Sequence, residues 1–456
     1  MTSRASTHKT IRVFQTARDT WDRLTEKEPI TVQEDTSSWN GFLNIYPDVK
    51  YQTIEGFGGA FTEAAAITLA KMAPHFRVEV LTAYFDANRG LGYTLCRTHI
   101  NSCDFSLENY SYVEDGDDSL STFDIKRDRA HLIPLIQDAK SVAGETFRLF
   151  ASPWSPPGWM KTTGTMNHGG TLLPEYRRTW AQYIAKYLQT YREAGIDIWG
   201  VTVQNEPAAV QTWDSCNYTA QEEADFVRDH LGPVLDAEGF GDVNIIIWDH
   251  NKDSLYRRAK VAYEDPEASK YIWGAGFHWY SGDHFGDLDA VHHVFPDKKL
   301  LFTEGCVEGG VKLGDWALGE RYGHHIIGDL NHWANGWVDW NIVLDEQGGP
   351  NHAQNYCDAP IIADVANQRL HYQPSYYYIG HVAKFVRPGA VRIGCSVYTD
   401  QLECVAFENP DGSIVVVVMN RTDSTIPYRF TTEPGKVAVG TSLAHSIQTL
   451  VIDSSN

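Results

Sequence analysis

The sequence predicts an α/β protein, a (β/α)8 TIM barrel with an attached antiparallel β-sandwich formed by both ends of the chain. Three observations carry this prediction: a length of 456 residues, eight strand-like runs that alternate with helical patterns, and a change to period-two alternation near residue 389. Barrels of this kind routinely exceed the ~150 residues of an average domain. We therefore assign residues 1–50 to N-terminal strands of the sandwich, 51–388 to the barrel and 389–456 to the C-terminal sandwich.

The eight runs of the central region are rich in β-branched and aromatic residues. They cover residues 54–61, 93–100, 146–154, 198–207, 243–251, 271–280, 299–305 and 336–344. Helical patterns lie between most of them, and the clearest, at 173–195, repeats aromatic residues at steps of three and four, which we interpret as a core-facing stripe. Eight such units imply parallel strands closed into a barrel. The alternative, an open doubly wound sheet, needs a G-x-G-x-x-G phosphate loop, and the first run reads GFGGAF instead.

The C-terminal region alternates by twos and carries the turn sequence Asn-Pro-Asp-Gly at 409–412. This pattern is typical of antiparallel strands. The region is shorter than the ~100 residues of a complete sandwich. We therefore expect strand-like segments near residues 11–15 and 41–46 to complete it.

The chain is acidic, with 38 Lys and Arg against 59 Asp and Glu and a net charge of −21. Such a surface repels nucleic acid and anionic lipid, so we expect neither as a partner. We also expect no membrane insertion, because the sequence contains no run of 18 apolar residues. The N-terminal residues show no apolar signal core, which predicts a cytoplasmic protein, or a secreted one if a signal has been removed. The composition is compatible with a homo-oligomer as well as with a monomer.

Polar and aromatic residues gather where the predicted strands end. In a barrel, the C-terminal ends of the strands face the active site. The residues at or just beyond these ends are Glu63, Arg97, His99, Trp154, Asn205, Glu206, Asp249, His250, His278, Tyr280, Glu304, Trp340 and Asn341. Carboxylates, amides and aromatic rings without a phosphate-binding glycine loop indicate a polyol ligand, so we expect a small carbohydrate or glycoside as the binding partner.

Two of these residues, Glu206 and Glu304, have the chemistry of a glycosidase. Glycoside cleavage needs one carboxylic acid to protonate the leaving oxygen and a second carboxylate to attack the anomeric centre. Strands four and seven lie roughly opposite in a barrel, so the two carboxyls can approach the ~5–5.5 Å spacing of a retaining enzyme. We expect Arg97 and Tyr280 to stabilise ionised Glu304, whose charge would then raise the pKa of Glu206.

Several stretches resemble glycoside hydrolase family 30, and within it the glucosylceramidase, or acid β-glucosidase, branch. They are EGFGGAFTEAAA, GYTLCRTHINSCDFS, ASPWSPPGWMKT, TVQNEP, DPEASKYIWGAGFHWY, LFTEGC, GWVDWNIVLDEQGGPNH and PDGSIVVVVMNR. The resemblance covers about residues 40–452 in matching order and spacing. It implies a barrel with a two-ended sandwich, Glu206 as acid/base and Glu304 as nucleophile.

The resemblance also implies the residues that bind the sugar. Trp154 and Trp340 match tryptophans of the S-P-W and D-W-N motifs, and Asn205 matches the asparagine expected at the sugar 2-hydroxyl. Glu63 stands where the branch has an aspartate that we expect to hold distal hydroxyls. The predicted substrate-binding set is Glu63, Arg97, Trp154, Asn205, His278, Tyr280, Trp340 and Asn355.

The predicted activity is that of a retaining β-glycoside hydrolase on soluble β-glucosides or oligosaccharides. The alternatives are a β-1,6-glucanase, a β-xylosidase or β-fucosidase, a transglycosylase of the same fold, and a non-catalytic carbohydrate-binding protein. No cofactor is expected, since the two-carboxylate mechanism needs none. No metal or disulfide framework is expected either, because the seven cysteines include no C-x-x-C pair and the histidines no H-E-x-x-H motif. Cys306, two residues after Glu304, is expected to line the site without attacking.

Overall fold

The computed structural model describes residues 10–454, which form two compact units. The barrel unit comprises residues 57–313 and 334–372, and the sandwich unit comprises the segment up to residue 56 with 314–333 and 373–456. Residues 51–56, 314–333 and 373–388, which the sequence pattern places in the barrel, cluster with the sandwich unit. Residues 1–9 of the predicted N-terminal segment lie outside the described residues.

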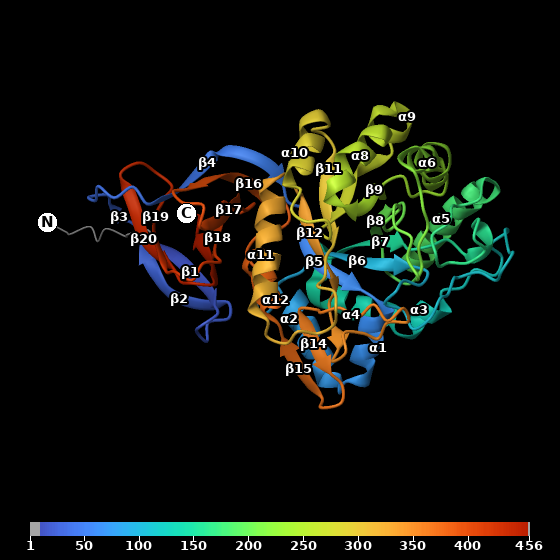
Figure 1. Ribbon diagram of the computed structural model, residues 1–456, viewed down its shortest axis with the longest axis horizontal. Helices are drawn as coiled ribbons and strands as arrows, with labels where there is room; N and C mark the ends of the chain where they lie inside the picture. Colours follow the sequence, from blue (N-terminus) through green and yellow to red (C-terminus); the bar gives the residue numbers. More distant parts are fainter. Residues whose placement is uncertain (1–9, 455–456) are drawn as a thin grey trace. The chain divides into compact units, whose positions relative to one another are not determined.

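Eight strands close into a barrel, and each lies within the corresponding predicted run (Figure 1). They are β5 (Gly56–Phe61), β6 (Leu95–Ile100), β7 (Arg148–Pro153), β8 (Ile198–Thr202), β9 (Asn244–Asn251), β10 (Ile272–His278), β11 (Lys299–Glu304) and β12 (Gly336–Asn341). Successive strands pair in parallel, as between β6 and β7 and between β9 and β10. The predicted TIM barrel is confirmed.

The barrel interior is filled by side chains and is not a channel. Leu95, Phe150, Ile246, Leu301 and Val338 form one fully buried cluster drawn from five strands. The glycines of β5 serve close strand packing, since a Cβ on Gly58 would lie 1.8 Å from the Leu95 carbonyl oxygen. This contact explains the GFGGAF sequence without a bound phosphate.

Helices follow most of the barrel strands. They are α1 (Glu63–Lys71), α2 (Pro74–Phe85), α3 (Lys126–Ala130), α4 (Leu132–Ala143), α5 (Arg177–Glu193), α6 (Ala220–Phe226), α7 (Gly232–Ala237), α8 (Leu255–Glu264), α9 (Pro266–Ser269) and α10 (Phe285–Val294). Helix α6 begins with a capping box between Thr219 and Glu222. Helix α5 buries Trp180, Tyr183 and Tyr187 on one face, so the aromatic stripe belongs to the core as expected.

A small three-stranded sheet extends the barrel unit beyond β12. Its strands are β13 (Leu344–Asp345), β14 (Ile361–Asp364) and β15 (Arg369–Tyr372). The long connection between β13 and β14 carries Asn355 and Cys357, both of which reach the functional site described below. Sequence reasoning did not foresee this sheet.

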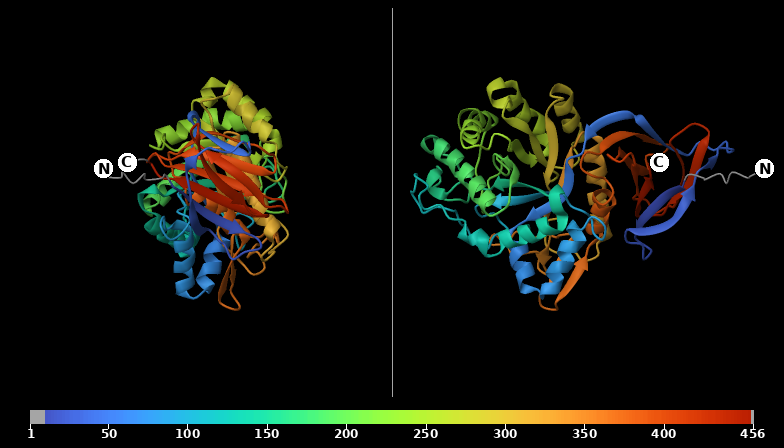
Figure 2. Two further views of the ribbon diagram at one scale, coloured as in Figure 1. Left: turned by 90° about the vertical axis from the view of Figure 1, so that its left-hand side faces the viewer. Right: turned by 180° about the vertical axis from the view of Figure 1, so that it is seen from behind.

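The sandwich unit interleaves strands from both ends of the chain, as the blue and red ribbons of Figure 2 show. Its strands are β1 (Thr10–Ala17), β2 (Thr25–Thr31), β3 (Gln33–Glu34), β4 (Phe42–Thr53), β16 (Val391–Val397), β17 (Leu402–Glu408), β18 (Ile414–Asn420), β19 (Ile426–Thr431), β20 (Lys436–Ser442) and β21 (Ser446–Ile452). Strand β1 pairs with β21, and β4 pairs antiparallel with β16 and parallel with β19. Helices α11 (Trp316–Asn331) and α12 (Pro374–Ala383) complete the unit.

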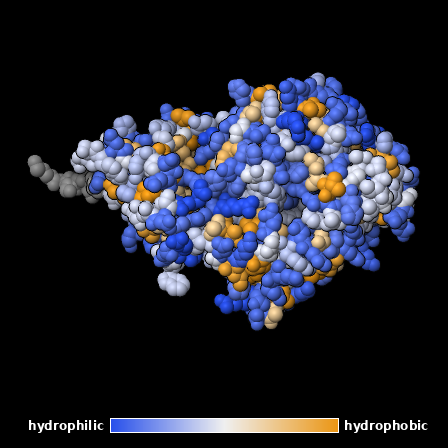
Figure 3. Space-filling view, viewed as in Figure 1, coloured by the Kyte–Doolittle hydropathy of each residue, from blue (hydrophilic) through white to orange (hydrophobic). Residues whose placement is uncertain are grey.

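The face shown in Figure 3 is mostly hydrophilic, and its hydrophobic residues form small separate groups. Among the described residues, no helix combines the length and the apolar character needed to cross a membrane.

Candidate active site

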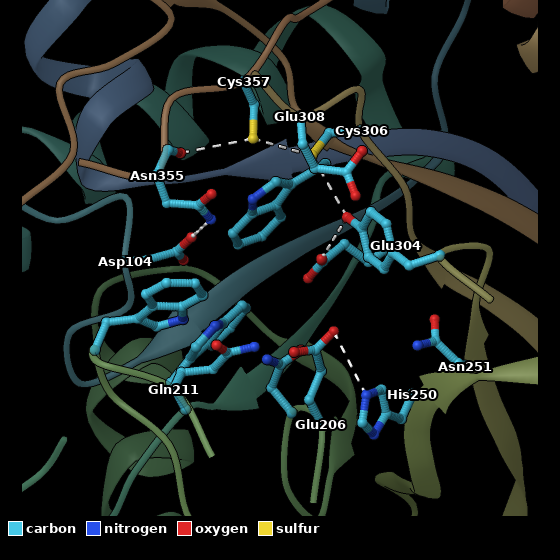
Figure 4. A pocket seen from close by; sticks show the side chains of 15 residues that line it. Asp104, Glu206, Gln211, His250, Asn251, Glu304, Cys306, Glu308, Asn355 and Cys357 are labelled. Atoms are coloured by element: carbon cyan, nitrogen blue, oxygen red, sulfur yellow. Dashed lines mark hydrogen bonds and ion pairs between the residues drawn. The ribbon is translucent and has the colours of Figure 1, made fainter. Parts of the chain in front are cut away.

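A cavity of about 250 Å³ opens at the C-terminal ends of the barrel strands (Figure 4). Its lining consists of Asp104, Trp154, Asn205, Glu206, Gln211, Trp213, His250, Asn251, Tyr280, Glu304, Cys306, Glu308, Trp340, Asn355 and Cys357. All of these residues belong to the barrel unit. Figure 4 shows Glu206 and Glu304 on opposite sides of this cavity.

Arg97 on β6 organises the floor of the site. Its fully buried guanidinium donates to Glu304 Oε2 at 2.6 Å, to Asn205 Oδ1 at 2.8 Å and to Asp249 Oδ2 at 2.8 Å. One planar donor fork thus fixes side chains from β11, β9 and the end of β8. Trp154 flanks the same guanidinium, with the ring centroid 4.7 Å from Cζ.

Both carboxylate oxygens of Glu304 accept hydrogen bonds. Oε2 accepts from Arg97, and Oε1 accepts from the Tyr280 hydroxyl at 2.9 Å. The residue ends β11, and its side chain is almost fully buried. These two donors hold the carboxylate in a single orientation at the cavity wall.

Glu206 lies beyond the end of β8 in a backbone conformation that non-glycine residues rarely adopt. Its φ is +49°, and Asp249 at the neighbouring strand end has φ +52°. The Glu206 amide donates to the Asp249 carbonyl at 3.0 Å, which locks the two strained positions together. Strain of this kind is retained where a side chain must be aimed precisely at a ligand.

His278 connects Glu206 with the buried charges. Its Nε2 contacts Asp249 Oδ1 at 2.9 Å, and its Nδ1 contacts Glu206 Oε1 at 3.3 Å. Although burial opposes the charged form, the charge of Glu304 and the hydrogen bonds to Asp249 and Glu206 raise the pKa of His278 to about 9. The imidazole is therefore an imidazolium at neutral pH and donates to both carboxylates.

The positive charge of His278 alters the pKa values that we expected for Glu206 and Glu304. Although burial opposes it, the hydrogen bond from His278 lowers the pKa of Glu206. Burial raises the pKa of Glu304, against the charges of His278 and Arg97. The shift in the pKa of Glu206 is thus opposite to the expected one. The physical reason is the positive charge of His278, which lies closer to Glu206 than to Glu304.

Two stacked tryptophans form an aromatic wall. Trp154 and Trp340 lie with ring centroids 5.0 Å apart and planes inclined by 20°. Flat indole faces of this kind pack against the apolar face of a pyranose ring.

Asp104 supplies a carboxylate that sequence reasoning missed. It follows β6 by four residues, lines the cavity and accepts from Asn355 Nδ2 at 3.0 Å. Burial and the charge of Glu304 raise the pKa of Asp104 to about 7. The signal was present in the stretch NSCDFS, where an acidic residue lies just past a barrel strand end.

Glu63, predicted to hold distal sugar hydroxyls, does not line the cavity. Its carboxylate accepts from Arg127 Nε at 2.7 Å and from the Leu107 amide at 2.8 Å. Glu63 thus braces the loop that follows β6, and Asp104 on that loop takes the position in the cavity. The two carboxylates follow neighbouring strands, so their positions in the sequence do not indicate which of them enters the cavity.

The structure brings the other predicted site residues together. Glu206, Glu304, Trp154, Asn205, Tyr280, Trp340 and Asn355 line the cavity, and Arg97 and His278 lie directly behind it. Cys306 also lines it, as expected. The residues not foreseen, besides Asp104, are Gln211, Trp213, Asn251, Glu308 and Cys357. Asn251 ends β9, and the other four lie outside the barrel strands, where no periodic pattern marks them.

One trio of potential metal ligands occurs among the described residues. Atoms of Glu206, His278 and Glu304 all lie within 4.8 Å of one another. Because the neighbouring carboxylates favour the protonated form of His278, a metal would have to displace a proton from this ring to bind it. The trio therefore fits proton transfer better than metal binding.

Comparison with known proteins matches both parts of the chain to one family. Residues 54–386 match the glycosyl hydrolase family 30 TIM-barrel domain, and residues 389–450 match the family's beta sandwich domain. The chain is 37% identical to the lysosomal acid glucosylceramidase of Mus musculus, over 87% of this chain and 80% of that protein. It is 29% identical to an endo-1,6-beta-D-glucanase of Neurospora crassa, over 91% and 88% of the two chains.

Solved structures agree with these sequence matches. The crystal structure of SrfJ from Salmonella typhimurium superposes with a TM-score of 0.94 at 39% identity, covering 98% of this chain and 100% of that one. The structure of an endo-β1,6-glucanase gives a TM-score of 0.86 at 28% identity, again with 98% and 100% coverage.

Proposed function

This chain belongs to glycosyl hydrolase family 30 and is a glycoside hydrolase, and on that premise we propose that it is a retaining β-glucosidase in which Glu206 is the acid/base and Glu304 the nucleophile. The spacing of the two carboxylates carries the proposal. Oxygens of Glu206 and Glu304 lie within 4.8 Å of each other. Retaining enzymes need a spacing of ~5–5.5 Å, whereas inverting enzymes need ~6.5–9.5 Å to admit a water molecule.

The hydrogen bonds support these two roles. Glu304 has both oxygens held by Arg97 and Tyr280, which suits a fixed nucleophilic carboxylate. Glu206 has only longer contacts, to His278 Nδ1 at 3.3 Å and to His250 Nε2 at 3.9 Å, and is partly open to the cavity, which suits a group that must give and take a proton. In the first step Glu304 attacks the anomeric carbon while Glu206 protonates the leaving oxygen. In the second step Glu206 removes a proton from water, which attacks the same carbon and releases Glu304.

Charge balance accounts for the proton that the first step needs. The buried cluster contains two cations, Arg97 and His278, and three carboxyl groups, Asp249, Glu206 and Glu304. The cluster is neutral when the glutamate pair retains one proton, and the pair titrates as a unit. Because the direct bonds from Arg97 and Tyr280 favour the negative charge on Glu304, we assign this proton to Glu206 in the substrate complex.

The size of the cavity supports action on a terminal sugar. Its volume of about 250 Å³ lies below the ~300–1,000 Å³ of sites for drug-sized ligands, so a single ring fits it better than a long chain. Trp154 and Trp340 offer the apolar wall, and Asp104, Asn205 and Asn355 offer hydroxyl partners. The glucosylceramidase named among the relatives supports glucose as the sugar.

An endo-acting β-1,6-glucanase is the second candidate. It is favoured by the solved endo-β1,6-glucanase that covers 98% of this chain. The two activities differ in their products, because an exo-enzyme releases glucose from a chain end while an endo-enzyme shortens the chain internally.

Three measurements test the proposal. The first is hydrolysis of aryl β-glucoside, β-xyloside, β-fucoside and β-galactoside, followed by β-1,6-linked gluco-oligosaccharides. The second is the anomer first released, read by NMR, which we expect to be β. The third is trapping with a 2-fluoro-β-glucoside and peptide mapping of the label. A label on Glu304 is expected, while a label on Glu308, the neighbouring pocket carboxylate, or an α anomer would overturn the mechanism.

A further inference from the structure

Two cysteines from separate loops meet at the wall of the cavity. Cys306 follows the nucleophile Glu304 by two residues, and Cys357 comes from the connection between β13 and β14. Their sulfur atoms lie 3.3 Å apart, with the Cys306 thiol donating to Cys357 Sγ. Figure 4 shows the two sulfurs side by side at the edge of the cavity. The structure contains both as free thiols.

This pair of thiols touches both halves of the sugar-binding machinery. On one side the Tyr280 hydroxyl contacts Cys306 Sγ at 3.4 Å and donates to Glu304. On the other side the Cys357 thiol contacts the Asn355 carbonyl at 3.6 Å, and the Asn355 side chain donates to Asp104. A change in the sulfur–sulfur distance is therefore transmitted to the nucleophile's hydrogen-bond donor and to the Asp104–Asn355 pair.

We propose that Cys306 and Cys357 form a reversible disulfide, so that the cavity wall is a modification site for small disulfide oxidants that switches the hydrolase off. The effect on activity rests on the proposed function, whereas formation of the bond does not. A disulfide needs a sulfur–sulfur distance of ~2.05 Å, so closure requires a movement of about 1.2 Å from the separation seen here.

The chemistry is a two-step thiol–disulfide exchange with balanced products. The Cys357 thiol loses its proton to solvent, and its sulfur attacks one sulfur of the oxidant RSSR, which releases RS⁻ and leaves a mixed disulfide. Cys306 then loses its proton and attacks the Cys357 sulfur, which releases the second RS⁻. Each RS⁻ takes up a proton, so two protein thiols and RSSR become one protein disulfide and two RSH.

The geometry gives Cys357 the attacking role. The Cys306 thiol donates to Cys357 Sγ at 3.3 Å, so a hydrogen-bond donor already faces the sulfur that attacks the oxidant. The hydrogen bond to Cys357 and burial raise the pKa of Cys306, which keeps that thiol protonated until the second step.

The charge of the cavity selects the class of oxidant. Four carboxyl groups, Asp104, Glu206, Glu304 and Glu308, line the same small space as the two sulfurs. Glu308 and the net charge of −21 of the whole chain repel anionic reagents, so an uncharged disulfide such as 2-hydroxyethyl disulfide is expected to react faster than glutathione disulfide, which carries carboxylates. A bound sugar fills the cavity and is expected to protect the thiols.

The consequence for catalysis follows from the required movement. Displacements of about 1 Å in a catalytic constellation cost up to about 100-fold in rate, so we expect oxidation to lower kcat/KM by about 10- to 100-fold. Reduction by dithiothreitol restores the original distance and therefore the activity.

The test oxidises the whole protein with 2-hydroxyethyl disulfide, with and without glucose, and reads two quantities. Peptide mapping under non-reducing conditions detects a cross-link between the peptides of Cys306 and Cys357, which appears whether or not any glycoside is hydrolysed. Aryl β-glucosidase activity is measured before oxidation, after oxidation and after reduction. If the reduced enzyme hydrolyses no glycoside, the proposed function fails while the map still decides the disulfide.

Two matched variants separate this pair from the other thiols. Cys357→Ser is expected to show the same activity before and after the oxidant, whatever its starting value, and Cys357→Val is the second choice if the serine variant does not fold. Cys395→Ser, in the sandwich strand β16, is expected to remain as sensitive as the unchanged protein. Absence of the cross-link, cross-linking without loss of activity, or undiminished sensitivity of both Cys357 variants would each overturn the proposal.

Discussion

The barrel mouth and the interior of the sandwich are equally shielded from solvent, yet they bury opposite kinds of side chain. The mouth buries charged groups, with Arg97, Asp249 and His278 all at 0% exposure. The sandwich cluster is built from aliphatic and aromatic residues such as Val416, Phe430 and Leu450. Removing charges from water is costly unless every partner is supplied, whereas burying apolar surface stabilises the fold directly. The mouth is therefore organised for chemistry and the sandwich for stability.

The largest effect on activity is expected from Glu304→Gln, a substitution at the barrel mouth. The neutral amide keeps the shape but cannot attack the anomeric carbon, so kcat should fall by about 10⁴–10⁶-fold, as when other covalent nucleophiles are removed. The melting temperature should change little, because Arg97 keeps its ion pair with Asp249 and the remaining two cations and two carboxyl groups of the cluster balance in charge. Activity on aryl β-glucosides and a thermal scan check both points. Glu308→Gln is the matched control from the same cavity and should lose far less.

A smaller effect is expected from substitutions of Asp104 and Glu63, the two carboxylates that follow the neighbouring strands β6 and β5. Asp104→Asn should lower kcat/KM by about 10- to 100-fold, because a hydrogen bond to a charged group contributes about 1.5–3 kcal/mol. Glu63→Gln should mainly lower the melting temperature, because it breaks the pair with Arg127. Steady-state kinetics and thermal scans of both variants decide this. A larger kinetic loss in Glu63→Gln than in Asp104→Asn would restore Glu63 to the sugar site.

These two residues also show how far the sequence alone could reach. The barrel strands were predictable because strand periodicity and turn residues are local, and Glu206 and Glu304 were predictable because strand ends face the barrel mouth. Whether Glu63 or Asp104 enters the cavity depends on Arg127, which lies more than 20 residues further along the chain. Local patterns do not encode that partner.

The same limit applies to longer-range features. Cys357 reaches Cys306 only because the connection after β13 folds back to the cavity. No periodic pattern in the sequence predicts the path of this connection. The lowered pKa of Glu206 was not foreseen because the contact from His278 depends on the pairing of β9 with both β8 and β10. Helix α11 follows the barrel strand β11 and helix α12 follows β15 of the small sheet, yet both cluster with the sandwich because α11 packs on β17 and α12 on β21. The sequence predicts the barrel strands, whereas long-range tertiary contacts determine which side chains line the cavity.

Matched leucine-to-alanine substitutions in the two hydrophobic cores should separate effects on stability from effects on catalysis. Leu301→Ala in the barrel interior and Leu450→Ala in the sandwich core each remove a fully buried leucine. Each should reduce the free energy of unfolding by about 2–5 kcal/mol. Only Leu301→Ala should also lower kcat, by about tenfold, because Leu301 lies on β11 three residues before Glu304. Denaturant titration and kcat below the melting range separate the two effects. Equal kcat losses would show that the sandwich also tunes the site.

The smallest effect is a displacement of the pH profile by His278→Gln. The imidazolium lowers the pKa of Glu206 through its hydrogen bond and also opposes the raised pKa of Glu304. Its removal should raise both pKa values, so both limbs of the kcat/KM profile, which reports the free enzyme, should move to higher pH by about one unit. His250→Gln is the control: burial lowers the pKa of His250, so this ring is neutral on the alkaline limb, and that limb should stay in place. An unshifted profile in His278→Gln would mean that Arg97 and Tyr280 alone determine the pKa values of the glutamate pair. The buried cluster would then act on Glu304 but would not be coupled to Glu206, the acid/base.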